Sequence, residues 1–281
     1  MSAPSPPYRL QSHLSRWGAS LDRLGLQTLF YGHTVRSTGD ALLHYRTEIL
    51  RLIAEMGFGV GALAVVGGTV GIVGFLTLSV GALVAVIGYN QLSQVGVEAL
   101  TGFISAFVNV RLVGPLIAGI ALAATIGAGA TAQLGAMRIN EEIDALEAMA
   151  VRAVPYLAST RLIAGVVVVI PLYCIALISA FVAAEAGTKV VYGQSAGVYD
   201  HYFTTFLDPD SVIWSFLLAV TMATVIMLVH TYYGFNAAGG PAGVGEAVGR
   251  AVRASLVSAT VMTTFVSLAI YGQSGNFHFS G

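Results

Sequence analysis

Four carboxylates lie close together in residues 138–149, which read Arg-Ile-Asn-Glu-Glu-Ile-Asp-Ala-Leu-Glu-Ala-Met. Neither the stretch before this acidic segment, residues 112–136, nor the stretch after it, residues 162–184, contains a charged residue. Both stretches are long enough to cross a bilayer, whereas a charged side chain at the bilayer centre costs about 2.5–3.5 kcal/mol or more. The acidic segment is therefore expected in water beside the membrane, where a soluble partner can reach it.

The acidic segment also has the residue pattern of a short helix. Asn140 is positioned to cap this helix, with Glu141 and Glu142 in the first turn, where the helix dipole favours negative charge. Apolar residues recur at helical spacing on one face, at Ile139, Ile143, Leu146 and Ala150. That face can rest on the rest of the protein while the carboxylates meet a basic partner. A solvated loop helix without a partner fits the same residues equally well.

Patterns for catalysis or nucleotide binding are missing from the sequence. The six histidines are scattered without metal-ligand spacing, and His230, in an apolar run, is expected to pack or to lie at the membrane interface. The only lysine is Lys189, and no Gly-x-x-x-x-Gly-Lys-Ser/Thr occurs. The glycine-rich residues 239–245 include a proline and follow no predicted strand, so we expect a turn. The chain is therefore expected to be no enzyme, and to bind no metal or cofactor itself.

Composition predicts a membrane protein of several helices. The chain has 281 residues, of which 56% are hydrophobic and 10% charged, whereas soluble domains carry about 25% charged residues. Five regions suit membrane-spanning helices: 53–89, 103–134, 162–184, 212–229 and 256–271. Their continuous apolar runs lack the alternation of β-barrel strands. The predicted fold is an all-α integral membrane bundle whose path for a substrate is apolar, and a net charge of −1 favours no nucleic-acid partner.

Charge also predicts how the chain is oriented. Arginines gather before the first apolar region, between the second and third, and between the fourth and fifth. This bias predicts a cytoplasmic N-terminus, a cytoplasmic acidic segment and an external C-terminus. Within a cytoplasmic N-terminal segment, residues 1–50, a stripe of Leu10, Leu14, Trp17, Leu21 and Leu24 predicts an amphipathic helix at the membrane surface. The same stripe would also suit packing on a partner protein. Residues 51–281 would form the transmembrane domain.

The acidic segment resembles a known signature. Residues 141–149, Glu-Glu-Ile-Asp-Ala-Leu-Glu-Ala-Met, resemble the signature of the MlaE/YrbE permease family, the membrane subunits of MCE-type ABC transporters that move lipids. Two further runs are similar to family motifs: Arg111-Leu112-Val113-Gly114-Pro115 and, after the fourth apolar region, Gly234-Phe235-Asn236-Ala237 with Gly243-Val244-Gly245. The resemblance implies five spans and an interfacial N-terminal helix. It also implies a cytoplasmic coupling helix at about residues 138–150, between spans two and three.

The resemblance further implies partners and site residues. A dimeric ABC ATPase would hold ATP and magnesium and receive the coupling helix, and MCE-domain proteins would form a lipid tunnel above a permease pair. The implied ATPase-coupling residues are Arg138, Asn140, Glu141, Glu142, Asp144 and Glu147. Candidate residues of an apolar lipid path are Phe75, Leu78, Phe103 and Phe107. The family's lipid pocket would lie in the outer part of the permease pair.

Three positions depart from the family pattern. Leu112 and Gln133 stand where members often carry glutamate, and Ile126 stands where an arginine is common. Such losses suggest one of two non-identical permeases, as in the actinobacterial Mce systems that pair two YrbE subunits in the bacterial plasma membrane. Two alternatives are an ATP-independent lipid channel or secondary transporter, and a divergent scaffold subunit. A channel or secondary transporter would need polar residues within the spans, and these are scarce.

Overall fold

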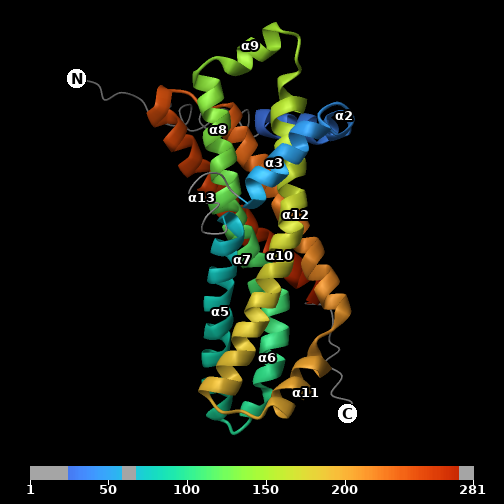
Figure 1. Cartoon of the computed structure of the whole chain (residues 1–281), viewed down its shortest axis with the longest axis vertical. Helices are drawn as coiled ribbons and strands as arrows, with labels where there is room; N and C mark the ends of the chain where they lie inside the picture. Colours follow the sequence, from blue (N-terminus) through green and yellow to red (C-terminus); the bar gives the residue numbers. More distant parts are fainter. Residues whose placement is uncertain (1–24, 59–67, 272–281) are drawn as a thin grey trace, which may run out of the picture.

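The computed structural model describes residues 25–58 and 68–271, and all its regular elements in these ranges are helical. Five helices are long and apolar enough to cross a membrane: Gly68–Ser93, Glu98–Ile139, Val154–Val191, Pro209–Phe235 and Gly240–Ala269. They run roughly alongside one another (Figure 1), which confirms the predicted five-span, all-α architecture. The predicted stripe from Leu10 to Leu24 lies outside the described residues.

The first predicted apolar region is divided in the structure. Residues 53–58 belong to α3 (Arg46–Phe58) and the first candidate span is α5 (Gly68–Ser93), so a region long enough to be tilted, broken or partly re-entrant contributes to two helices, and the candidate span starts later than residue 53. The reason is charge, because Arg51 of α3 pairs with Glu48 at 2.6 Å and with Glu55 at 2.9 Å. No charged residue occurs in α5. The other four predicted regions lie inside the corresponding helices, the last of them inside α13 (Gly240–Tyr271), and all four helices begin earlier in the chain than predicted.

The second and third spans are composite. The second contains α6 (Thr101–Val108), α7 (Gly114–Leu122) and α8 (Ala128–Ile139), joined by the π-helical turns Asn109–Val113 and Ala123–Gly127. The third consists of the π-helical turn Val154–Ser159, α10 (Thr160–Ala186) and a second π-helical turn, Gly187–Val191. At a rise of about 1.5 Å per residue the second span is about 60 Å long, twice the bilayer hydrocarbon thickness of about 30 Å. It therefore extends into water.

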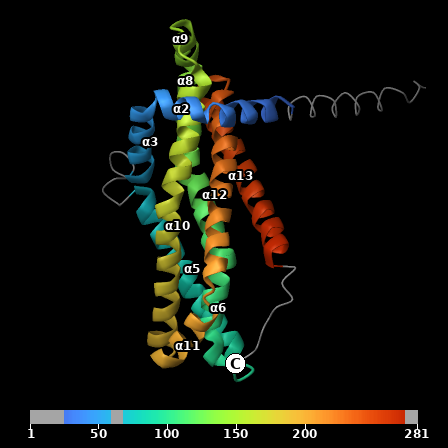
Figure 2. The same ribbon diagram turned by 90° about the vertical axis from the view of Figure 1, so that its right-hand side faces the viewer.

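Short helices mark the two ends of the bundle. At one end α9 (Glu142–Ala148) connects the second and third spans, and at the other end α11 (Ala196–Phe206) precedes α12 (Pro209–Phe235). We call these the α9 end and the α11 end. Residues 25–36 and α2 (Thr38–His44) lie across the bundle at the α9 end (Figure 2). The final helix, α13 (Gly240–Tyr271), starts at the α9 end.

Close helix contacts hold the bundle together. A Cβ atom at Gly81 of α5 would lie 2.3 Å from the Ala180 carbonyl oxygen of α10, so glycine allows these two backbones to touch. His230 of α12 is fully buried, as a packing histidine should be. Its ring lies 2.7 Å from the Thr131 hydroxyl of α8 and 3.1 Å from the Ser255 hydroxyl of α13. These contacts join three spans.

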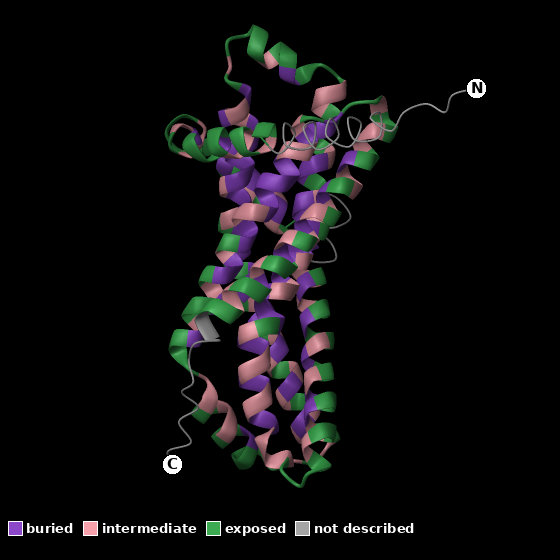
Figure 3. Cartoon of the chain, turned by 180° about the vertical axis from the view of Figure 1, so that it is seen from behind, coloured by how far each residue is buried: buried purple, intermediate pink, exposed green. Residues whose placement is uncertain are grey.

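Apolar side chains also cover much of the outer surface. Buried residues follow the inner faces of the helices, whereas exposed ones follow the outer faces (Figure 3). Large exposed apolar residues on α5, α12 and α13 include Phe75, Leu83, Ile213, Phe265 and Leu268. In water such an apolar surface would favour aggregation, but within a bilayer it is covered by lipid tails, which are equally apolar.

Candidate functional site

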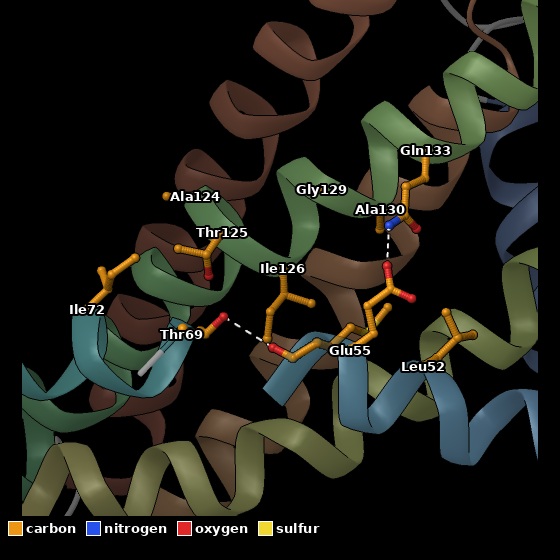
Figure 4. A pocket seen from close by; sticks show the side chains of 12 residues that line it. Leu52, Glu55, Thr69, Ile72, Ala124, Thr125, Ile126, Gly129, Ala130 and Gln133 are labelled. Atoms are coloured by element: carbon orange, nitrogen blue, oxygen red, sulfur yellow. Dashed lines mark hydrogen bonds between the residues drawn. The ribbon is translucent and has the colours of Figure 1, made fainter. Parts of the chain in front are cut away.

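A pocket of about 320 Å³ lies where α3, α5 and the second span meet. Its apolar wall is formed by residues of all three elements, including Leu52, Met56, Ile72 and Ile126. Its polar lining is formed by Glu55, Thr69, Thr125 and Gln133, which Figure 4 shows among the surrounding ribbons. The pocket is thus amphipathic, with the charged α3 on one side and the uncharged α5 on another.

Two residues of the polar lining, Glu55 and Gln133, belong to a hydrogen-bonded network of five residues, which we call the Glu55 network: Glu48, Arg51, Glu55, Gln133 and Arg161. The Gln133 amide nitrogen donates to Glu55 Oε1 at 2.6 Å, and Arg51 donates to Glu55 Oε2 at 2.9 Å. Arg161 is only 4% exposed and donates to the Gln133 amide oxygen at 3.4 Å. The hydrogen bonds from Arg51 hold the pKa of Glu48 below its usual value. The network therefore joins α3, α8 and α10.

Sequence reasoning did not find this network. Glu55 and Gln133 are 78 residues apart, and Gln133 and Arg161 are 28 apart, so spacing along the chain does not relate them. The available signal was that Glu55 and Arg161 are charged residues at the edges of apolar runs. Two of the three departures from the family pattern, Ile126 and Gln133, both line the pocket. The third, Leu112, is half exposed at 49% and does not line it.

The acidic segment forms α9 at the end of the bundle, held by two contacts. Ile143 is fully buried against Leu134 and Leu157. Arg138 pairs with Asp144 at 2.7 Å, which fixes α9 to the end of α8. The carboxylates of the segment, at positions 141, 142, 144 and 147, belong to exposed residues. The predicted division into a packed face and an acidic solvent face is confirmed for Ile143 and is wrong for Ala150, which is exposed.

The predicted cap of α9 is wrong. Asn140 ends α8, because its backbone N–H still donates to the Ala136 carbonyl, and its φ of −90° and ψ of 7° are not those of an N-cap. The residue before α9 is Glu141, whose φ of 60° is left-handed and whose side chain makes no capping bond. Glu142 is thus the first helical residue. Ala150, with a φ of 61°, lies beyond the other end of α9.

A groove of about 320 Å³ runs beside α9. It is lined by Glu147, by residues 150–155 and by His33, which belongs to residues 25–36 that lie across the bundle. Arg152, on its wall, pairs with Asp40 of α2 at 2.5 Å. The α9 end therefore presents acidic side chains next to a concave surface.

The predicted lipid-path residues do not form one cluster. Phe103 and Phe107 are neighbours on α6, with ring centroids 5.5 Å apart, and Arg111 stacks over the Phe107 ring at 4.2 Å. Phe75 and Leu78 are exposed on α5. Phe75 lies in the first third of α5, and α6 begins near the other end of that helix. As a lipid path, these four residues remain a prediction.

Comparisons with known proteins agree with the fold. The family model of the permease MlaE matches residues 60–269. A probable ABC transporter permease protein of Rickettsia bellii is 29% identical over 184 residues, 64% of this chain and 70% of that protein. The intermembrane phospholipid transport system permease protein MlaE of Haemophilus influenzae is 28% identical over 187 residues, 64% and 70% of the two chains. The chloroplastic protein TRIGALACTOSYLDIACYLGLYCEROL 1 of Arabidopsis thaliana is 23% identical over 187 residues, 66% and 53% of the two chains. Since the family model covers most of the sequence, this chain belongs to the MlaE permease family.

Proposed function

We propose that this chain is the membrane permease subunit of an ATP-driven transporter that moves lipid across the bacterial plasma membrane. In this proposal α9 docks on a separate ATPase, which holds ATP and magnesium, and the permease itself binds no cofactor. Membership of the family and the names of the Rickettsia and Haemophilus relatives support a permease for lipid. The observation that carries the coupling role is the exposed acidic helix α9 at the end of the bundle.

The geometry of α9 suits the transmission of movement. Ile143 and the pair of Arg138 with Asp144 attach α9 firmly to the bundle, so a displacement of α9 also displaces its neighbours. The second span ends directly before α9 and the third begins shortly after it, at Val154. The exposed carboxylates offer charge complementarity to a basic surface, which steers association and fixes register.

Orientation is part of the proposal. The arginines of α3, of the acidic segment and of the start of α13 lie in elements at or near the α9 end. By the positive-inside rule this end would face the cytoplasm, where an ATPase has access to ATP. The α11 end would then face outward, toward MCE-domain proteins that guide lipid.

The partner permease is expected to be a different chain. Ile126 and Gln133, which replace charged family residues, lie in the same pocket, so the loss of charge is concentrated at one place. A second YrbE-type subunit that keeps those charges would complete the pair. A purified complex with two copies of this chain and no other permease would refute this pairing.

Charge reversal on α9 tests the coupling role. Glu142→Lys combined with Glu147→Lys should weaken co-purification of the ATPase by about tenfold or more, because like charges facing a basic surface cost several kcal/mol. These two residues are exposed and make no ion pair within the described chain, so the fold should persist. The control is Glu246→Lys on α13, another exposed carboxylate near the α9 end.

The outcomes separate the alternatives. Unchanged ATPase association in the double variant, with normal membrane insertion, would refute docking through α9. Lipid movement by the permease in vesicles without any ATPase would favour a channel or secondary transporter. A complex that keeps full transport after both reversals would favour a scaffold role for this chain.

A further inference from the structure

The pocket at the junction of α3 and α5 lies where the polarity of the chain changes. Glu55 and the rest of the charged face of α3 lie on one side, and α5 has no charged residue along its whole length. In a bilayer such a change marks the level of the lipid headgroups, with α5 continuing among the tails. Because the pocket is lined from both helices, its polar and apolar parts match the two parts of a lipid.

Three of the four polar side chains that line the pocket, those of Thr69, Thr125 and Glu55, offer hydrogen-bond acceptors. Thr69 donates its hydroxyl hydrogen to the Met56 carbonyl, and Thr125 donates to the Ala121 carbonyl, so both hydroxyl oxygens can only accept further bonds. Glu55 adds carboxylate oxygens with lone pairs left over after the bonds from Gln133 and Arg51. A ligand that donates hydrogen bonds therefore finds three acceptors here, whereas the side-chain donor left over is the second amide N–H of Gln133.

Positive charge is close by, and most of its donors already have acceptors, although the buried Nε of Arg161 has no partner among the described residues. Among the described residues that line the pocket there is no lysine or arginine. Arg51 is shared between Glu48 and Glu55, and Arg161 donates to Gln133 and to the Leu157 carbonyl. Two arginines thus face two carboxylates in the network. A net anionic headgroup would add an unbalanced charge to this partly buried cluster, which is unfavourable.

We infer that this pocket is a binding site for a membrane lipid whose headgroup is not net anionic and donates hydrogen bonds, such as an amine or hydroxyl headgroup, with Glu55 as the recognising acceptor. Its volume of about 320 Å³ lies at the lower end of the range of small-molecule pockets, about 300–1,000 Å³, which suits a headgroup with part of a chain. The inference deepens the proposed function by naming a lipid class. Binding itself requires neither an ATPase nor transport.

Two glycines allow a matched test of occupancy. Gly129 lines the pocket, and a Cβ atom there would meet nothing within 4 Å, so the side chain of Gly129→Leu has open space at its base and adds apolar volume at the pocket. Gly74 of α5 is equally unobstructed and does not line the pocket, which makes Gly74→Leu the control. Glu55→Gln keeps the size of the side chain and removes its charge, so it tests recognition rather than occupancy.

The experiment places the full chain in nanodiscs of phosphatidylethanolamine, phosphatidylcholine and phosphatidylglycerol in equal parts. Native mass spectrometry after mild detergent release then counts the retained lipid. We expect the unmodified chain and Gly74→Leu to retain phosphatidylethanolamine in preference to phosphatidylcholine, whose headgroup has no N–H. Gly129→Leu should lose this lipid. Glu55→Gln should lower the preference by about fivefold, because a charge-assisted hydrogen bond becomes a neutral one.

Three results would overturn the inference. These are equal retention by Gly129→Leu and Gly74→Leu, an unchanged preference in Glu55→Gln, and preferential retention of anionic phosphatidylglycerol. Failure of the proposed function has a different signature, since a chain that retains phosphatidylethanolamine but never associates with an ATPase would refute only the coupling role of α9.

Discussion

Replacing Gly81 with alanine should force α5 away from α10. The new Cβ atom would lie 2.3 Å from the Ala180 carbonyl oxygen and 2.8 Å from the Ala180 Cα atom. These are backbone atoms, which cannot rotate aside as a flexible side chain can. Since ordinary contacts lie at about 3.5–4.0 Å, the two helices would have to separate by about 1 Å.

The energetic cost follows from this separation. Overpacking of a close interface costs about 1–3 kcal/mol, and a gap of up to 1 Å beside the clash weakens neighbouring contacts as well. Alanine also has a better helix propensity than glycine by about 1 kcal/mol, which offsets part of the loss. Gly74→Ala, in the same helix, gains the same propensity without a clash. The difference between the two variants, about 1–3 kcal/mol, therefore isolates the contact with α10.

The assay is thermal unfolding of the purified chain in one detergent, followed for both variants and the unmodified protein. A chain of this size shifts its Tm by about 2–4 °C per kcal/mol, so Gly81→Ala should melt roughly 5 °C below Gly74→Ala. Equal melting temperatures for the two variants would show that α5 and α10 do not approach as closely as the structure has them.

Three smaller predictions concern other contacts. Thr131→Val should destabilise the bundle by about 1–2 kcal/mol in a chemical-unfolding experiment, because buried His230 loses a partner, whereas Thr131→Ser should not. Burial tends to raise the pKa of Asp208, but hydrogen bonds from the first turn of α12 outweigh it and the pKa is lowered. The contribution of Asp208 to stability should thus be complete above about pH 4 and should decline as the pH falls through the lowered pKa. In Asp208→Asn this part of the pH dependence of stability should be missing. Removing the ion pair of Arg152 with Asp40 by Asp40→Asn should cost under about 1 kcal/mol and should matter less at high salt, since Arg152 is largely exposed.

The number of spans could be predicted because each span contains one long uncharged run, a signal that is present in the local sequence. The edge of the first span could not, because residues 53–58 are apolar enough to extend the run. Glu55 lies among these residues and pairs with Arg51 just before them, which gives α3 a charged face that α5 lacks. The helical spacing of the charged residues within α3 indicates this polar face, whereas the average hydropathy of the region does not.

The candidate site was only partly predictable for a similar reason. The exposed carboxylates of α9 follow from sequence, because composition alone excludes them from lipid. The start of α9 does not, since Asn140 suits a cap equally well whether α8 ends there or earlier. The Glu55 network depends on the packing of three distant helices, which no local pattern encodes.

Helix α8 packs more closely against α12 than against α3. This difference determines between which helices the bundle can separate. Toward α12 the contacts of α8 are dry and tight: a Cβ atom at Gly127 would meet the His230 ring at 2.5 Å, and one at Gly234 would meet Leu134 at 2.8 Å. Toward α3, by contrast, Gln133 of α8 donates a hydrogen bond to Glu55, and these two partly exposed side chains lie beside an open pocket. A force on α9 would thus carry α8, α12 and α13 as one body. The helices would then separate along the pocket between α8 and α3, so the volume of this pocket would change whenever α9 is displaced.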